Sequence, residues 1–435
     1  MIALSLAEVA ALCPGTLVPA QGAVEIRGVV IDSRRVASGD LFVAISSGSD
    51  FCSQALERGA AATLVPDDPN SALAALGAAV RARSSARVVA ITGSTGKTST
   101  KDILAALCGA RAQVVAAEAS FNNELGIPLT LCRVEPETEI AIVEIGMRGL
   151  GQITEACRVV RPHIGLITSV GPVHLELLGT LEHVAQAKAE VLSALEPGGI
   201  GVIPAGEPLL EPFLPAGVEL RSFGPGGSSS LVDFAPREHT SGAVFDIEGE
   251  RVTLELPLNA RHQALNILAA LVVYAALGFP LEAVQEAVSA ITLSRWRGEE
   301  TALSGEGILI NDAYNANPVS LRAALDHQAE RAGGRRRVAV LGTMAELGAD
   351  SAGYHRELGA HAASLGITAL VAVGDEAREY LSQAERIPIR EWAADANAAI
   401  PIARALVEPG DCVLVKGSRV VGLEAVADAL KDAQT

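Results

Sequence analysis

The chain has 435 residues, 49% of them hydrophobic and 20% charged, with a formal net charge of −17. This composition excludes a globally disordered chain, and the acidic balance argues against nonspecific binding of nucleic acid or of an acidic membrane. No apolar run reaches the roughly 18 residues that cross a bilayer. The six cysteines show no C-x-x-C spacing, which indicates free thiols in a reducing compartment. We therefore expect a cytoplasmic protein of two or three domains without a membrane span.

The first block, residues 1–82, predicts a small N-terminal α/β domain. Strand-like runs occur at 24–31, 41–45 and 62–65, and an alanine-rich segment follows at 71–82. The RARSSA stretch at 81–86 is expected to form a linker to the next domain.

The second block, residues 83–294, predicts a central domain with a doubly wound, mostly parallel sheet, because apolar runs alternate with helical patterns from residue 87 onward. Between 204 and 249 the pattern loosens into Gly/Pro/Ser-rich loops, with weak strands at 243–247 and 251–256. A long helix is expected at about 262–277. The third block, residues 295–435, repeats the βα alternation and indicates a Rossmann-like module.

A glycine-rich segment that follows the apolar run at 88–92 predicts a nucleotide site. It reads Gly93-Ser94-Thr95-Gly96-Lys97-Thr98-Ser99 and leads into a helical pattern. Backbone N–H groups in such a turn, and the N-terminus of the helix after it, favour phosphate. Lys97 would reach the outer phosphates of ATP and Thr98 would bind Mg²⁺. Since position 91 is Ile, the strict P-loop pattern is not met, and a tight turn with a chance lysine is the alternative.

Three further residues are candidates for the same site. Glu144 and His174 follow predicted strands at the edge where open α/β sheets place ligands, although each alone would more often be structural. Lys188 lies on the apolar face of a helix predicted from Thr180 to Leu192. It could extend to the surface, or it could be a desolvated amine with a lowered pKa. Carbamylation of such an amine by CO₂ would create an anionic oxygen ligand for Mg²⁺.

Lysine is rare in this chain, since only five of the 34 basic residues are lysines. Where arginine is the default cation, a lysine indicates a place that needs a compact ammonium or a reactive amine. Lys97, Lys188 and Lys416 all fall at predicted sites.

Several motifs, in order from Asp32 to Arg419, resemble the Mur ligase superfamily. They are ITGSTGKTSTKD, FNNELGIPLTL, VEIGM, SVGPVHLELLG with AQAKAE, and LVKGSR. NDAYNANPVS and LGTMAELG narrow the resemblance to the MurF type, the UDP-N-acetylmuramoyl-tripeptide–D-alanyl-D-alanine ligases. The resemblance implies ATP-dependent amide-bond formation through an acyl phosphate in peptidoglycan precursor synthesis. It also implies ATP and two Mg²⁺ ions as cofactors; we expect a monomer.

The resemblance further implies residue roles. Catalysis would involve Lys97, Glu144, His174 and Lys188. The metals would be held by Thr98, Glu144, His174 and carbamylated Lys188. Beyond the glycine-rich segment, ATP would contact Asn266 with its adenine, Arg297 with a phosphate and Asp312 with its ribose. Substrate would contact Asp32, Ser33, Arg34, Asn122, Asn123, Tyr314, Asn315, Asn317, Lys416 and Arg419. Ser418 would lie beside Lys416 and Arg419 at the edge of the third domain's cleft.

Some points stay open. Asn317 precedes Pro318 and could simply cap a helix. Gln263 stands where the family commonly has Asn, and the loop after Phe42 is shorter than usual. The rival functions are a sibling ligase that adds the third amino acid, a folylpolyglutamate-type enzyme, and a P-loop ATPase that regulates a partner. The sibling's Asp-Asn-Pro-Arg signature is absent from the corresponding stretch, ALVAVGDEAREY.

Overall fold

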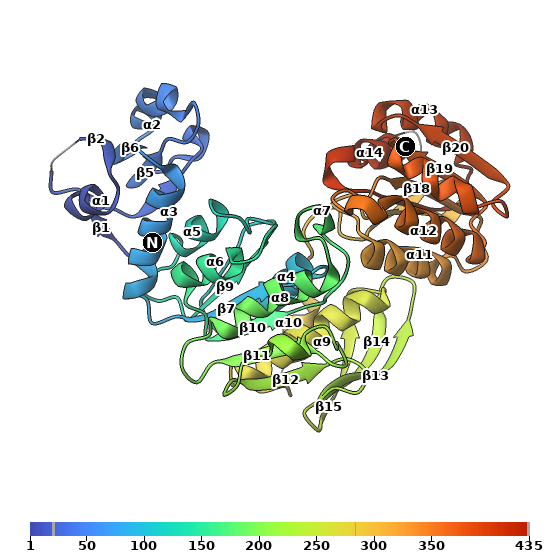
Figure 1. The fold of residues 1–435 in the computed structure, drawn as a ribbon, viewed down its shortest axis with the longest axis horizontal. Helices are drawn as coiled ribbons and strands as arrows, with labels where there is room; N and C mark the ends of the chain where they lie inside the picture. The colour runs from blue at the N-terminus through green and yellow to red at the C-terminus, as the bar shows by residue number, and fades with distance from the viewer. Residues whose placement is uncertain (20–21, 283, 433–435) are drawn as a thin grey trace.

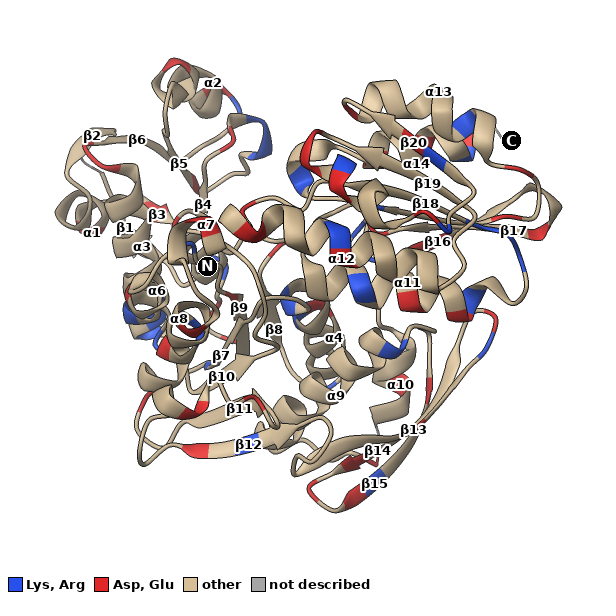
Figure 2. Ribbon diagram, turned by 45° about the vertical axis from the view of Figure 1, so that its right-hand side comes forward, with Lys and Arg blue, Asp and Glu red and all other residues tan. Residues whose placement is uncertain are grey.

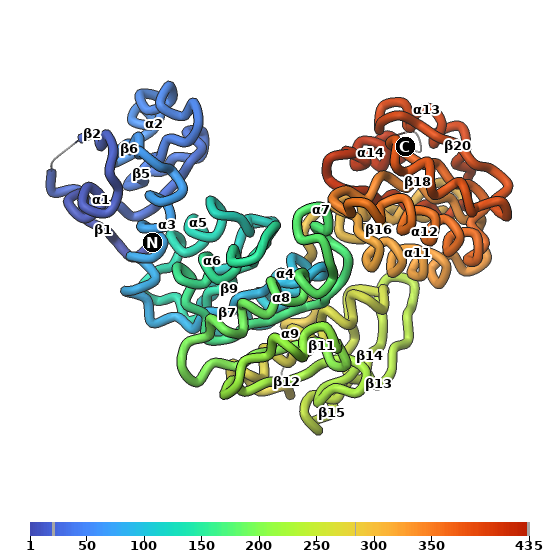
Figure 3. The backbone as a smooth tube through the Cα atoms, in the orientation of Figure 1, coloured from blue at the N-terminus to red at the C-terminus, as the bar shows by residue number. Residues whose placement is uncertain are grey.

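The computed structural model describes residues 1–19, 22–282 and 284–432, and it has three α/β lobes that follow one another along the chain (Figure 1). The N-terminal lobe and the C-terminal lobe lie at opposite ends of the molecule, and both rest on the central lobe (Figure 3). The predicted α/β class, with a mostly parallel central sheet and a Rossmann-like third lobe, is confirmed.

The first lobe is built on a four-stranded sheet of order β2-β6-β5-β4 and a small β1-β3 pair. Its strands are β1 Leu4–Ser5, β2 Gly15–Val18, β3 Glu25–Ile26, β4 Gly28–Val30, β5 Asp40–Val43 and β6 Ala62–Pro66, and its helices are α1 Leu6–Leu12, α2 Cys52–Glu57 and α3 Pro69–Arg83. The single strand expected at 24–31 is therefore wrong. It is divided at Arg27, because β3 pairs with β1 while β4 pairs with β5 in the other sheet.

The linker expected at 81–86 is wrong in its first half, because helix α3 continues through Arg83. Arg81 is buried, and its guanidinium donates to the carbonyl oxygens of Val160 and Arg161, at 3.0 Å each. Both acceptors belong to the central lobe. The last turn of α3 is thus fastened to that lobe.

The central lobe carries a nine-stranded sheet of order β15-β14-β13-β12-β11-β10-β7-β9-β8. Its strands are β7 Arg87–Thr92, β8 Val114–Ala116, β9 Ile140–Glu144, β10 Ile164–Ile167, β11 Ile200–Pro204, β12 Glu219–Phe223, β13 Ser229–Pro236, β14 Ser241–Ile247 and β15 Glu250–Leu256. Strands β7 to β13 pair in parallel, and β14 and β15 extend the sheet antiparallel. Strands β12 and β13 correct the expectation of loops at 204–249. Their polar, partly exposed residues hid them in the sequence.

Helices cover both faces of this sheet. They are α4 Lys97–Gly109, α5 Gly126–Leu131, α6 Gln152–Val160, α7 Leu175–Leu178, α8 Leu181–Ser193, α9 Arg261–Ala276 and α10 Val284–Ser289. Residues of β7 alternate between the faces: Val88 and Ala90 join the core with α6 and α8, whereas Val89 and Ile91 join the core with α4 and α9. Burial on both faces explains why these strands are continuously apolar.

The third lobe has a six-stranded sheet of order β16-β17-β21-β18-β19-β20, parallel except for the edge strand β16. Its elements are β16 Glu299–Leu303, β17 Gly307–Asn311, α11 Pro318–Ala332, β18 Arg337–Gly342, α12 Ser351–Ser364, β19 Ala369–Val373, β20 Ile389–Ala393, α13 Ala396–Leu406, β21 Cys412–Lys416 and α14 Glu424–Asp432. Figure 2 shows basic and acidic residues along α11 and α12, where Arg322 and Glu357 form an ion pair at 2.5 Å.

Two predictions about the whole chain can be compared with the structure. All six cysteines are free. Within the described residues, no helix combines the length and the apolar character that a membrane crossing requires.

Candidate functional site

The glycine-rich turn lies between β7 and α4, as predicted, and its shape depends on two glycines. Gly93 has φ +147° and Gly96 has φ +80°, values that L side chains rarely adopt. A Cβ on Gly93 would lie 1.9 Å from Thr168 Oγ1, and a Cβ on Gly96 would lie 2.5 Å from Asn266 Oδ1. The turn therefore packs against the end of β10 and against α9. Asn266, predicted to contact adenine, lies directly beside the turn.

Lys97 is the first residue of α4, and its ammonium donates to Gly93 O at 2.7 Å within the turn. Burial lowers the pKa of Lys97 and Arg297 adds to this effect, whereas Glu144 opposes it. The ammonium thus stands at a helix N-terminus in a site with few compensating charges. Such a position favours an anionic ligand.

Glu144 ends β9 and is 1% exposed. Its Oε1 accepts a hydrogen bond from Asn122 Nδ2 at 2.7 Å, whereas its Oε2 is buried and has no hydrogen-bond partner among the described residues. A buried carboxylate oxygen without a donor is costly unless a cation satisfies it. The Glu144 side chain therefore fits a metal ligand.

Lys188 lies inside α8 and is 2% exposed, so the interpretation that it extends to the surface is wrong. Thr180 caps the helix by accepting from His183 N, as predicted. Burial places the pKa of Lys188 well below its ordinary value, and the nearby charge of Lys97 lowers it further. The side chain is therefore a desolvated amine at this site.

His174 precedes α7 in a left-handed backbone conformation, with φ +53°. Its Nδ1 contacts the carboxylate of Glu346, a residue of the third lobe. Burial lowers the pKa of His174, and Lys97 and Lys188 lower it further, although Glu346 opposes them. The structure thus gathers Glu144, His174 and Lys188 within electrostatic range of Lys97.

Arg297 joins the third block of the chain to the glycine-rich turn. Its Nη2 donates to Thr98 Oγ1 at 2.9 Å, and its guanidinium carbon lies 3.9 Å from the centre of the Tyr314 ring. The Tyr314 hydroxyl contacts Ser120 Oγ in the central lobe. Gln263 donates to Arg297 O at 3.4 Å. These contacts bring a cation from the start of the third block to the phosphate end of the site.

Asn317 caps a helix, as one of the two interpretations of the sequence predicts, and it also contacts the glycine-rich turn. Its Oδ1 accepts from Ser320 N at 2.9 Å and caps α11, with Pro318 at the first turn. Its Nδ2 donates to Ser94 O of the glycine-rich turn at 3.3 Å. One amide therefore begins a helix of the third lobe and contacts the nucleotide turn.

The other predicted third-lobe residues form a neighbouring cluster. Lys416 Nζ donates to Asp312 Oδ2 at 2.5 Å and to Asn315 O at 2.9 Å. Ser418 Oγ donates to Ala316 O at 3.3 Å. Arg419 instead pairs with Glu424 at 2.6 Å and lies 4.7 Å from the centre of the Trp296 ring. Since Asp312 is engaged by Lys416, a ribose would have to share its carboxylate.

Among the residues predicted to bind substrate in the first half of the chain, Asn122 is brought to the site by its contact with Glu144, whereas Asp32, Ser33 and Arg34 contact one another or Gln54 within the first lobe. Asp32 and Arg34 form an exposed ion pair at 2.8 Å, and Ser33 donates to Gln54 at 2.7 Å within the first lobe. Hydrogen bonds from Arg34 to the Asp32 carboxylate lower the pKa of Asp32 to about 2. Asn123 Oδ1 accepts from Gly126 N at 3.0 Å. The N-terminal lobe, which carries Asp32, Ser33 and Arg34, lies across the molecule from the third lobe (Figure 1).

Three family models match the chain in order. They are described as Mur ligase family, catalytic domain, over residues 25–111, Mur ligase middle domain over 91–274, and Mur ligase, glutamate ligase domain, over 296–419. The chain belongs to the Mur ligase family. Among its relatives, the UDP-N-acetylmuramoyl-tripeptide–D-alanyl-D-alanine ligase of Escherichia coli is 33% identical over 99% of both chains. That of Bacillus subtilis is 32% identical over 83% of both.

Solved structures agree with this family and with its MurF type. A crystal structure of MurF from Acinetobacter baumannii superposes with a TM-score of 0.87 at 27% identity and covers 99% of both chains. MurF ligase from Thermotoga maritima in complex with ADP gives 0.82 at 27% identity, over 94% of this chain and 98% of that one. Folylpolyglutamate synthase from Mycobacterium tuberculosis, with a TM-score of 0.66 at 18% identity, shares the fold alone.

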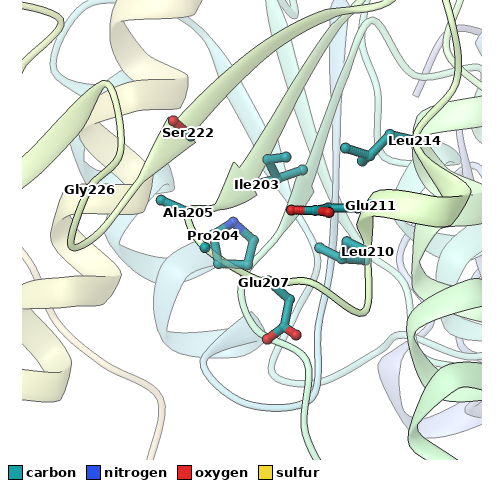
Figure 4. A pocket seen from close by; sticks show the side chains of 10 residues that line it. Ile203, Pro204, Ala205, Glu207, Leu210, Glu211, Leu214, Ser222 and Gly226 are labelled. Atoms are coloured by element: carbon teal, nitrogen blue, oxygen red, sulfur yellow. The ribbon is translucent and has the colours of Figure 1, made fainter.

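Two small pockets lie outside the predicted contacts of this Mur ligase. One, of about 200 Å³, is lined at the end of β11 by residues that include Ile203, Glu207 and Glu211 (Figure 4). The other, of about 390 Å³, lies between α9 and α11 and is lined by residues that include His262 and His327. None of the residues predicted for the nucleotide lines either pocket. The described part of the chain contains no cluster of three or more His, Cys, Asp or Glu that could hold a metal.

Sequence reasoning missed two residues that the structure places in this network. Glu346 contacts His174, and its only sequence signal was the LGTMAELG motif. Lys101, on helix α4, is 2% exposed, and its only sequence signal is the rarity of lysine in this chain.

Proposed function

We propose that this Mur ligase joins D-alanyl-D-alanine to UDP-N-acetylmuramoyl-tripeptide and converts ATP to ADP and phosphate, in peptidoglycan precursor synthesis. The observation that carries the proposal is the grouping of Lys97, Glu144, His174 and Lys188 around the glycine-rich turn, with Arg297 facing Thr98. The names of the relatives and the ADP bound to the Thermotoga maritima ligase support the same substrates.

The reaction proceeds in two balanced steps. A carboxylate oxygen of the tripeptide bonds to the γ-phosphorus of ATP, the bond from that phosphorus to the β–γ bridging oxygen breaks, and ADP leaves. The amine of D-alanyl-D-alanine then bonds to the carbonyl carbon of the acyl phosphate, inorganic phosphate leaves, and the nitrogen loses a proton. Two anions must approach one another in the first step, so charge neutralisation matters more than a nucleophilic side chain.

The residues of the turn supply that neutralisation. The ammonium of Lys97 exchanges its contact with Gly93 O for the outer phosphates, and the N-terminus of α4 adds backbone donors. Arg297 brings a second cation against Thr98. Closure of the lobes over the bound substrates would exclude water and protect the acyl phosphate from hydrolysis.

Two Mg²⁺ ions would be held by Thr98, Glu144, His174 and carbamylated Lys188. The unpartnered Oε2 of Glu144 and the desolvated amine of Lys188 both fit this assignment. Bound Mg²⁺ supplies Lewis-acid polarisation of the phosphoryl oxygens. The lowered pKa of His174 favours the neutral imidazole, the form that ligates metals. Full activity of Lys188→Ala, with bicarbonate or without it, would show that no carbamate is needed.

The remaining assignments extend the proposal to the rest of the chain. Asp32, Ser33 and Arg34 would bind the uridine diphosphate in the N-terminal domain. Asn122 and Asn123 would contact the muramoyl peptide. The domain boundaries near residues 82 and 294, the monomeric state and the cytoplasmic location remain predictions.

One assay of phosphate release tests this function against its rivals. With ATP present, we expect release only when both UDP-muramoyl tripeptide and D-alanyl-D-alanine are added. Release with a UDP-muramoyl dipeptide and a diamino acid would indicate the sibling ligase, and release with a folate and glutamate would indicate the folylpolyglutamate type. Release that ignores D-alanyl-D-alanine would indicate an ATPase switch and contradict the proposal.

A further inference from the structure

Lys101 is a buried cation on α4, one turn after Lys97, to which the proposed mechanism gives no role. Its ammonium donates to Ala117 O at 2.7 Å and Ala119 O at 2.8 Å, and it pairs with Asp102 Oδ1 at 2.8 Å. An ammonium has three N–H donors, and here each of them finds an acceptor. A rigid guanidinium does not match this compact arrangement, which explains a lysine in an arginine-rich chain.

The two carbonyls that Lys101 binds begin the loop that carries the predicted peptide-binding residues. Ala119 has φ +45°, a left-handed conformation that is uncommon for a residue with a side chain. Lys101 therefore fixes a strained turn at the base of this loop. Three residues further on, Asn122 donates to Glu144. The loop thus runs from a contact with the nucleotide helix to a contact with a proposed metal ligand.

The partner of Lys101 holds a second segment. Asp102 Oδ2 accepts from Ser294 N at 2.8 Å and from Ser294 Oγ at 2.7 Å. Ser294 lies three residues before Arg297, whose guanidinium reaches Thr98 on the same helix. By holding Ser294, Asp102 thus helps to place Arg297 at the phosphate end of the site.

The two held segments meet again at one aromatic ring. Ser120, next to Ala119 in the loop, contacts the Tyr314 hydroxyl, and Arg297 stacks on the Tyr314 ring at 3.9 Å. The contacts therefore form a closed circuit that begins at Lys101 and returns to its neighbour Asp102 on α4.

We propose that Lys101, supported by Asp102, is a positioning residue that couples the nucleotide helix to the peptide-binding loop of the ligase. It sets the loop from Ala117 to Asn123 relative to bound ATP, so that the tripeptide carboxylate meets the γ-phosphate in line. The inference rests on the proposed function, because the loop has a substrate to position only if the chain is this ligase.

The test compares Lys101→Met with wild-type enzyme, and each rate is divided by the concentration of enzyme that binds ATP. We expect kcat/KM for UDP-muramoyl tripeptide to fall about 10²-fold, the scale of a 1 Å misplacement. The Kd for ATP, measured by calorimetry, should change by less than about threefold, because Lys97 contacts Gly93 O and the turn packs against Thr168 and Asn266 without Lys101. Lys101→Gln serves as a second variant if Lys101→Met does not fold. Lys431→Met, which removes a lysine paired with Glu299 in the third lobe, is the control and should behave as wild type.

A double-mutant cycle separates positioning from general destabilisation. Ser120→Ala breaks the loop's contact with Tyr314. In the Lys101→Met background, where the loop is already displaced, Ser120→Ala should lower kcat/KM for the tripeptide by less than about a further twofold. The inference would be overturned if the loss of kcat/KM in the double variant equalled the product of the losses in the two single variants. It would also be overturned if Lys101→Met kept a kcat/KM for the tripeptide within threefold of wild type, or if it lost ATP affinity by as large a factor as kcat/KM. Failure of the proposed function would instead appear in the wild-type enzyme, as phosphate release indifferent to D-alanyl-D-alanine.

Discussion

The effect of the buried Lys188 amine on the stability of the protein can be measured directly. Its pKa lies well below the ordinary value because of burial and of the nearby charge of Lys97. Between the lowered pKa and the ordinary one, near 10.4, the folded chain binds fewer protons than the unfolded chain. Stability of the wild type must therefore rise with pH across this window, by on the order of 1 kcal/mol per pH unit. Lys188→Met removes the titrating group and fills the same apolar face of α8.

We expect Lys188→Met to melt at a higher temperature than wild type at pH 7, in buffer free of bicarbonate and metal. The gap between the melting temperatures of Lys188→Met and wild type should narrow as the pH rises to 9, by about 2–4 °C per pH unit for a lobe of this size. Added bicarbonate should narrow it as well, because a carbamate next to Lys97 adds an attractive charge pair that Lys188→Met cannot form. The variant should lose ligase activity at least about 10²-fold, as expected for a lost metal ligand.

Thermal melts at pH 7, 8 and 9 provide the measurement. Leu192→Met, a substitution of similar volume on the same helix, is the matched control, and its offset from wild type should not depend on pH. A wild type that is as stable as Lys188→Met at pH 7, with no change in the gap up to pH 9, would refute the idea of a desolvated neutral amine.

Three other predictions follow from the contacts of the site. Gly93→Ala should weaken ATP binding at least about 10²-fold by calorimetry, because its Cβ would lie 1.9 Å from Thr168 Oγ1, whereas Gly109→Ala on α4 meets nothing within 4 Å and should bind normally. Asn317→Ala should lower stability by about 1 kcal/mol and raise KM for ATP, while Asn317→Asp should restore the cap and the melting temperature but not KM, since a carboxylate cannot donate to Ser94 O; equal rescue of both would assign Asn317 to capping alone. Glu144→Gln keeps an oxygen for Asn122 but loses the charge of the unpartnered Oε2, so a Mg²⁺ titration should show half-saturation at higher concentration and kcat lower by about 10²-fold; an unchanged titration would exclude Glu144 as a ligand.

Features whose cause lies within a few neighbouring residues could be predicted from the amino-acid sequence. The glycines of the turn, the N-caps Thr180 and Asn317, and the place of Lys188 on an apolar face all follow from local spacing. Each reflects backbone sterics, a capping hydrogen bond or helical periodicity, which neighbouring residues fix. Strands β12 and β13 escaped because their partly exposed polar residues give no such local pattern.

The tertiary structure alone decided which of these residues meet. Glu346 reaches His174 across 172 positions, and Tyr314 reaches Ser120 across 194. Arg81 looked like part of a linker until the central lobe supplied carbonyls for its guanidinium. Lys101 became informative only when two carbonyls and a carboxylate converged on it. Such partners are chosen by the packing of helices and lobes, which brings together groups that no periodicity along the chain relates.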